Sequence, residues 1–102
     1  MGFKAARAAL VAALREGSFN HEARGSISEK NLLAVGDVEP EAVAGLVLRT
    51  RAIDYDESRH HWDESVTVHT FTPTVGGERW YIKAYFVEED GPATFISVHR
   101  SE

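Results

Sequence analysis

The sequence predicts an α+β domain in which N-terminal helices pack on one face of a C-terminal three-stranded antiparallel sheet. Three observations support this fold class. Apolar residues recur with helical spacing in the first half of the chain, whereas apolar and polar residues alternate in the second half. The chain has 102 residues, of which 43% are hydrophobic, enough for one core. We therefore expect a single domain over residues 1–102.

Three helices are predicted in the first half. The segment from Phe3 to Glu16 is rich in Ala and Leu, places its apolar side chains near one face, and stops at Gly17. A short helix capped by Ser28 extends through Leu33 and ends at Gly36. A third helix opens at Glu39-Pro40, ends near residues 49–51, and has a buried stripe of Val43, Leu46 and Val47.

Three strands are predicted in the second half, over residues 64–72, 78–88 and 93–100. Turn signals separate them at Pro73 to Gly77 and at Asp90-Gly91-Pro92. The preceding polar and aromatic segment, DYDESRHHWDES, shows no clear period and is predicted to be a loop. Consecutive hairpins of this kind predict an antiparallel meander.

The alternation in the second and third strands assigns side chains to the two faces of the sheet. Facing the core, we expect Trp80, Ile82, Ala84, Phe86, Ile96 and Val98. The other face then receives Tyr81, Lys83, Tyr85, Val87, Phe95, Ser97 and His99. A register whose residue numbers sum to about 180 or 182 brings together Tyr81, Lys83, Ser97 and His99.

The first strand is less constrained. If Val66 and Val68 face the core, then Thr67, His69 and Phe71 lie beside the Tyr81 group. The connection over residues 73–77 permits odd and even loop lengths. A change of one residue in that length would move the His69 side chain to the other face of the sheet.

The simplest interpretation of this polar face is an ordinary solvated sheet surface. Its residue types also suit RNA cleavage without a metal ion. That reaction needs a base for the 2′-OH proton, an acid for the 5′-oxygen and a cation for the phosphorane charge. Histidine titrates near neutral pH, lysine supplies charge, and tyrosine donates a hydrogen bond or stacks on a base.

Composition excludes several other functions. The chain has no cysteine, which excludes disulfides and thiolate chemistry. Its net charge of −5 argues against a protein that coats nucleic acid, although residues 1–30 carry five basic and three acidic side chains. We find no membrane span or signal peptide in the pattern and expect a cytoplasmic protein without a membrane partner.

The remaining histidines are weaker candidates. His60 and His61, with Asp54, Asp56 and Asp63, have metal-ligand chemistry but lack the spacing of known metal motifs. We expect no metal or cofactor. A metal-dependent hydrolase that uses His60, His61 and Asp63 is kept as a further hypothesis, after the two given below. His21 is expected to be a capping or surface residue.

Four short segments resemble the MqsR family of toxins from type II toxin–antitoxin systems. They are Asp54-Tyr55-Asp56-Glu57-Ser58, Trp62-Asp63-Glu64, Tyr81-Ile82-Lys83 and Ser97-Val98-His99. The resemblance covers nearly the whole chain and implies a RelE-like messenger-RNA endonuclease with a cognate antitoxin as partner. It implies that Tyr81 is the catalytic tyrosine and that the family's C-terminal lysine falls on His99 or Arg100. Glu57 and Asp63 depart from the family, which has lysine and glutamine there.

The leading hypothesis is a metal-independent endoribonuclease toxin that cleaves messenger RNA. In it, His99 is the general acid or base, Tyr81 a donor or stacking group, and Lys83 and Arg100 stabilise the phosphate. His69, or a histidine of the 60–61 pair, is the second proton-transfer group. The substrate-binding residues are Arg100, His61, Trp62 and Tyr85. The alternative is a non-catalytic binding or regulatory protein on the same scaffold.

Overall fold

The computed structural model describes residues 1–23 and 27–101 and has an α+β fold. Its strands form one mixed sheet in the order β1-β6-β5-β3-β2, and β4 pairs with β5 beyond this row. Only the pairing of β1 with β6 is parallel among these described strands. The strand bounds are β1 Phe19–His21, β2 Tyr55–Arg59, β3 Thr67–Phe71, β4 Thr74–Val75, β5 Glu78–Phe86 and β6 Ala93–Arg100.

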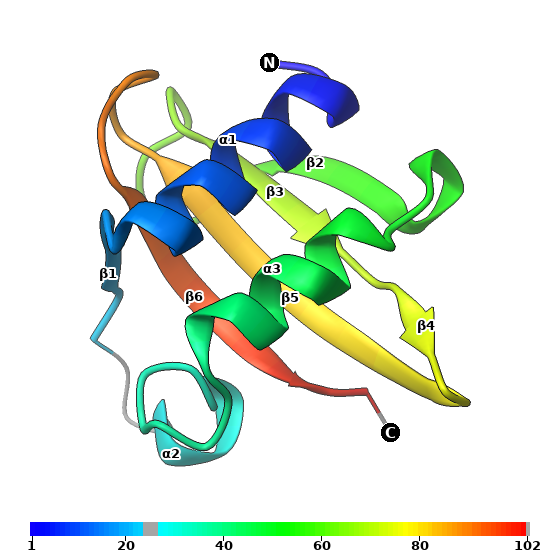
Figure 1. Cartoon of the computed structure of the whole chain (residues 1–102). Coiled ribbons are helices and arrows are strands. Elements are labelled where there is room, and N and C mark those ends of the chain that lie inside the picture. Colours follow the sequence, from blue (N-terminus) through cyan, green and yellow to red (C-terminus); the bar gives the residue numbers. More distant parts are fainter. Residues whose placement is uncertain (24–26, 102) are drawn as a thin grey trace.

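Two helices, α1 (Phe3–Glu16) and α3 (Pro40–Leu48), lie across one face of the sheet (Figure 1). Both agree with the sequence-based prediction. Gly17 ends α1 with a φ of 71°, and its N–H donates to the carbonyls of the last turn. Pro40 occupies the first turn of α3. A backbone N–H there has no partner within the helix, so the N–H that proline lacks costs no hydrogen bond. Within the described residues, no helix has both the length and the apolar composition needed to cross a membrane.

The short helix α2 (Ile27–Lys30) ends earlier than expected, and the 3₁₀ turn η1 (Ala52–Asp54) precedes β2. The chain leaves α2 at Asn31, which forms a parallel bridge to Val98 of β6. The next residue, Leu32, donates its N–H to the Val98 carbonyl at 2.8 Å. This pairing replaces the extra helical turn that was predicted. The expected capping role of Ser28 lies outside the described side chains.

The main core lies between the two long helices and the sheet. Its largest fully buried side chains are Phe71, Phe95, Leu10, Leu14 and Ile82. The predicted stripe of α3 is confirmed, because Val43, Leu46 and Val47 are all buried. The predicted alternation of β5 is confirmed as well, since Trp80, Ile82 and Ala84 belong to this core.

The face assignment at the start of β6 is wrong. Lys83 pairs with Ser97, but Ala84 pairs with Phe95, so Ile96 is an extra residue in a β-bulge. The extra residue shifts the alternation by one position. Phe95 is therefore in the main core with no exposed surface, and Ile96 lies outside that cluster.

Three strands were not predicted, and one of them, β4, lies in the segment that was expected to be the turn between the first two predicted strands. Residues 55–59, expected to be part of a loop, form the edge strand β2, and residues 56–59 of it are exposed. Residues 19–21 form β1, which covers part of the other edge of the sheet beside β6. The strands β1 and β2 widen the expected three-stranded sheet.

Candidate functional site

Tyr81 and His99 lie directly opposite each other on β5 and β6. Their rings stack with centroids 5.3 Å apart and an interplanar angle of 29°. Lys83 occupies the next position of the same face, opposite Ser97. The register sums to 180 at both pairs, as predicted, so the strand pairing does bring these four residues together.

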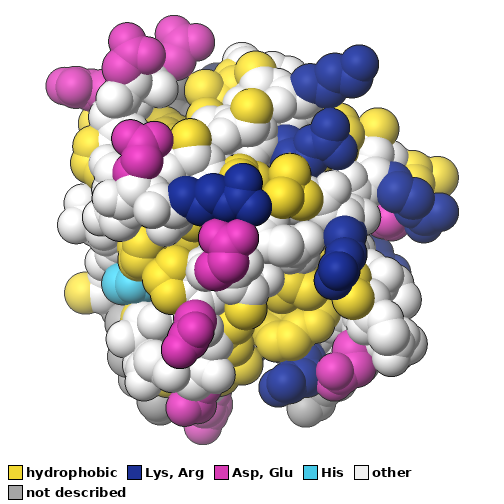
Figure 2. All heavy atoms as spheres, in the orientation of Figure 1, with side chains coloured by type: hydrophobic (Ala, Val, Ile, Leu, Met, Phe, Trp, Pro, Cys, Tyr) yellow, Lys and Arg dark blue, Asp and Glu magenta, His cyan; other side chains and the backbone are white. Residues whose placement is uncertain are grey.

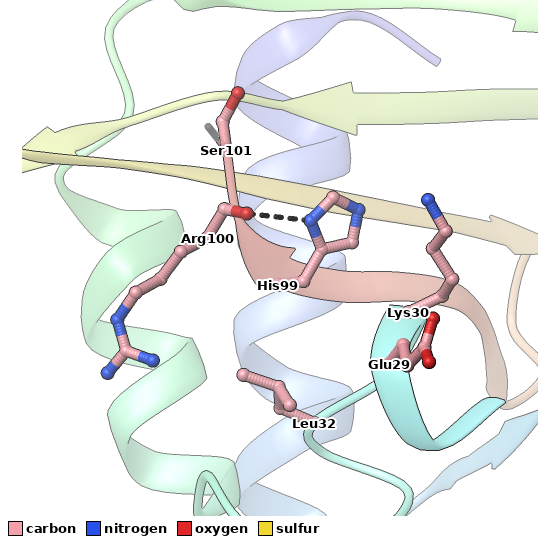
Figure 3. Close-up of a pocket in the computed structure, with 6 residues that line it drawn as sticks. All are labelled: Glu29, Lys30, Leu32, His99, Arg100 and Ser101. Atoms are coloured by element: carbon pink, nitrogen blue, oxygen red, sulfur yellow. Dashed lines mark hydrogen bonds between the residues drawn. The ribbon is translucent and has the colours of Figure 1, made fainter. Parts of the chain in front are cut away.

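The hydrogen bond of His99 distinguishes its two ring nitrogens. Nδ1 donates to the backbone carbonyl of Arg100 at 2.9 Å, because a carbonyl oxygen can only accept. In the neutral ring this leaves the lone pair on Nε2. Figure 3 shows Nε2 on the side of the ring away from that carbonyl. Nε2 is therefore the atom of His99 that can accept a proton from a substrate.

A hollow lies on each side of the Tyr81–His99 stack. The β2–β5 hollow, about 400 Å³, is lined by residues that include Asp56, Thr70, Thr72, Arg79, Tyr81 and Lys83. The α2–β6 hollow, about 590 Å³, is lined by Glu29, Lys30, Leu32, His99, Arg100 and Ser101 (Figure 3).

The charged residues Arg79, Asp56 and Lys30 also line these hollows, and none of them was expected beside Tyr81 and His99. Arg79 lies two positions before Tyr81 on β5, so the alternation of the strand is enough to predict that it shares this face. Asp56 was treated as part of a loop, and it reaches the hollow because β2 pairs with β3. Lys30 approaches His99 only through the bridge between Asn31 and Val98, for which the sequence carries no local signal.

The predicted position of His69 is wrong. It pairs with Ala84, a core residue of β5, and is 4% exposed. It therefore faces away from the Tyr81 group. Of the two registers that the sequence left open for this strand, the structure has the one that places His69 on the opposite face. Val68 and Thr70 occupy the positions opposite Tyr85 and Lys83 instead. Phe71, which pairs with Ile82, is turned to the core for the same reason.

His69 forms a cluster on this opposite face with Tyr55 and Glu57. The hydroxyl of Tyr55 lies 2.6 Å from Glu57 Oε2 and 2.6 Å from His69 Nδ1. Burial is the main cause that raises the pKa of Tyr55, and Glu57 adds to it. Burial also lowers the pKa of His69, partly offset by Glu57. Glu57, which pairs with His69, thus lies on the face of the sheet opposite Tyr81.

Arg100 does not reach the position expected for a phosphate ligand beside Tyr81. It lines the α2–β6 hollow, but it pairs with Trp80 and its guanidinium lies over that ring at 4.7 Å. Its Nε also forms an ion pair with Glu78 at 2.9 Å. The alternation of β6 after the bulge directs this cation to the other face.

The other expected binding residues surround a buried polar cluster. Glu22 Oε2 accepts hydrogen bonds from Tyr85 Oη at 2.8 Å and from His60 Nε2 at 2.9 Å. The donor role of His60 Nε2 follows because its Nδ1 already accepts from the backbone N–H of Trp62. The side chain of His60 is only 8% exposed, whereas Trp62 is 75% exposed. This cluster fixes the turn after β2 against β5, and His61 is exposed on it.

The remaining polar candidates have structural contacts. Asp63 accepts hydrogen bonds from the hydroxyl and N–H of Ser65, and these bonds lower the pKa of its carboxyl. His21, expected at the surface, is half-buried and accepts a hydrogen bond from Asn31. Over residues 1–23 and 27–101, no group of three or more His, Asp or Glu side chains is arranged to hold a metal ion.

We compared the chain with protein-family models and found no match. Comparisons with curated proteins and with solved structures found no significant match either.

Proposed function

We propose that the protein is a metal-independent endoribonuclease whose active site is the face of β5 and β6 around Tyr81, Lys83 and His99. The observation that supports this most directly is the stacked pair of Tyr81 and His99, with Lys83 in the adjacent row. The three side chains are half-buried, which leaves each of them accessible to a substrate. Their functional groups match the base, donor and cation that cleavage of RNA requires.

The reaction is the transfer of the phosphate ester from the 5′-oxygen to the neighbouring 2′-oxygen. His99 Nε2 takes the proton of the 2′-OH as the 2′-oxygen bonds to phosphorus. The bond from phosphorus to the 5′-oxygen breaks, and the Tyr81 hydroxyl donates a proton to that leaving oxygen. The Lys83 ammonium neutralises the charge that builds on the non-bridging oxygens. His69 takes no part in this scheme because it lies on the opposite face.

The resemblance to MqsR toxins supports the same proposal from the sequence. The quoted segments place the family's catalytic tyrosine at Tyr81 and a substituted lysine at His99. The α+β architecture is compatible with the RelE-like fold that this resemblance implies. We accordingly propose messenger RNA as the substrate and a cognate antitoxin as the protein partner.

The test compares cleavage of a defined RNA by wild type, His99→Gln, Tyr81→Phe and Lys83→Gln, with Lys4→Gln as a charge-matched control on exposed α1 surface. We expect each site variant to lose about 10²- to 10⁴-fold in rate, as is typical for the loss of an acid or base or of a charge-stabilising donor. The Lys4 variant should retain the wild-type rate. Equal cleavage by all variants would exclude this site.

A substrate with sulfur in place of the 5′-oxygen separates the two proton-transfer roles. Because a thiolate leaves without protonation, Tyr81→Phe should cleave this substrate at close to the wild-type rate. His99→Gln should remain slow, since its 2′-OH proton still needs a base. If wild type neither binds nor cleaves RNA, the non-catalytic binding protein replaces the enzyme as the explanation.

A further inference from the structure

The α2–β6 hollow brings a residue of the N-terminal third next to His99. Lys30 and Glu29 come from α2, whereas His99, Arg100 and Ser101 come from the end of β6 and beyond it. Figure 3 shows the side chain of Lys30 and the ring of His99 extending to the same side of β6. The guanidinium of Arg100 points away from them in this view.

A fully buried asparagine fixes this arrangement. Asn31 has no exposed surface, and its two side-chain polar atoms are both satisfied. Its Nδ2 donates to His21 Nδ1, and its Oδ1 accepts from the N–H of Ala34, each at 3.1 Å. Its backbone forms the bridge to Val98, the residue before His99. Lys30 is therefore attached immediately before a rigid anchor on the active-site strand.

The charges along the Tyr81–His99 stack are distributed on both sides of it. Lys83 lies in the β2–β5 hollow on the Tyr81 side, and Lys30 lies in the α2–β6 hollow on the His99 side. Arg100, the other cation of the α2–β6 lining, is already engaged by Glu78 and Trp80. An RNA strand that crosses the stack would thus meet a lysine before it and a lysine after it.

We propose that Lys30 binds a backbone phosphate adjacent to the cleaved bond, on the His99 side of the stack. The inference rests on the proposed function, since it assigns a further phosphate-binding residue to the same site. Lys30 holds the strand across His99 so that the 2′-OH is presented to Nε2. Glu29, on the same short helix, limits how strongly this hollow attracts phosphate.

The experiment measures binding of a 2′-O-methyl RNA oligonucleotide, which binds but cannot be cleaved. Lys30→Gln should weaken binding about 5- to 10-fold at low salt, the loss expected for one charge-assisted contact. The slope of log K against log salt should fall by about 0.7, the value for one phosphate contact on a single strand. Lys30→Arg should restore both quantities, and Lys4→Gln should leave them unchanged.

A second series locates the phosphate. Oligonucleotides that each carry one neutral methylphosphonate are compared between wild type and Lys30→Gln. At one linkage beside the cleavage position, the neutral group should weaken binding to wild type but not to the variant. If Lys30→Gln matches wild type in affinity, salt slope and linkage series, the assignment of Lys30 is wrong while cleavage by wild type still supports the enzyme. Failure of wild type to bind or cleave RNA overturns both.

Discussion

At the scale of single residues, the cluster of Tyr55, Glu57 and His69 shows how burial fixes protonation states. A carboxylate can only accept, so the one hydroxyl proton of Tyr55 goes to Glu57 and Nδ1–H of His69 must donate to Tyr55. The raised pKa of Tyr55 keeps this phenol protonated. Because the cluster lies away from Tyr81, its contribution is to stability rather than to the proposed chemistry.

This cluster predicts a dependence of stability on pH. The pKa of His69 is lowered in the folded state by burial, so the unfolded chain takes up a proton first as the pH falls below about 6.5. The free energy of unfolding should therefore decrease between about pH 7.5 and about pH 5.5. His21, whose pKa burial also lowers, acts in the same direction.

Thermal unfolding across this pH range tests the prediction. His69→Gln should show a flatter dependence of Tm on pH than wild type, because it removes the group with the shifted pKa. His61→Gln, at an exposed position, should keep the wild-type profile. Identical profiles for the His69 variant and wild type would contradict the assignment.

At the scale of secondary-structure elements, the bulge in β6 decides which side chains enter the core. A regular strand would place Phe95 beside Ser97 and His99 on the half-exposed face. With Ile96 inserted, Phe95 is instead fully buried beneath the helices. The bulge leaves the pairing of Tyr81 with His99 unchanged. The register shift lies between Lys83 and Ala84, beyond Lys83 as seen from Tyr81.

The bulge predicts a large effect at Phe95. Phe95→Ala should lower the free energy of unfolding by about 3–5 kcal/mol, as expected for removal of a buried aromatic ring. Val87→Ala, at a position that is 71% exposed, should change it by less than about 0.5 kcal/mol. Urea denaturation measures both. A small effect at Phe95 would mean that β6 follows the regular alternation.

The elements also show what a sequence can predict. The helix Phe3–Glu16, the first turn at Pro40 and the register of Tyr81 with His99 follow from local patterns that the structure retains. The strand β2 was missed because four of its five side chains are exposed, which leaves no apolar alternation to detect. The face of His69 depended on the geometry of the residue 73–77 connection, where β4 forms, and no pattern in the strand itself determined it.

The charged residues of the site also differ in whether the sequence could have predicted their positions. Arg79 has the same strand parity as Tyr81 and was open to prediction. Lys30 was not, because its position depends on a backbone bridge between distant segments. Long-range pairing of this kind leaves no trace in the spacing of nearby residues.

At the scale of the whole molecule, acidic side chains gather at one turn of the sheet. Figure 2 shows Asp and Glu side chains gathered at the turn between β5 and β6, and a mixture of both charge types over the face that carries α1 and α3. The turn contributes Glu88, Glu89 and Asp90, all of them exposed.

The acidic turn should slow the association of RNA through long-range repulsion. The triple variant Glu88→Gln, Glu89→Gln and Asp90→Asn should bind RNA with an association rate a few-fold higher at low salt. The gain should disappear at high salt, where the Debye length is only a few ångströms. Stopped-flow binding measures the rate at both salt concentrations. An equal gain in both conditions would indicate a direct contact instead.

The bridge from Asn31 to Val98 has a consequence for how the proposed active site forms. During synthesis the α2 segment emerges long before β6, so Asn31 has no strand to bridge to until β6 is available. Contacts between such distant segments form late in folding, because closing the long intervening loop costs entropy first. A partly synthesised chain would therefore hold Lys30 and Tyr81 without the strand that carries His99, and the proposed nuclease would remain inactive until β6 is in place.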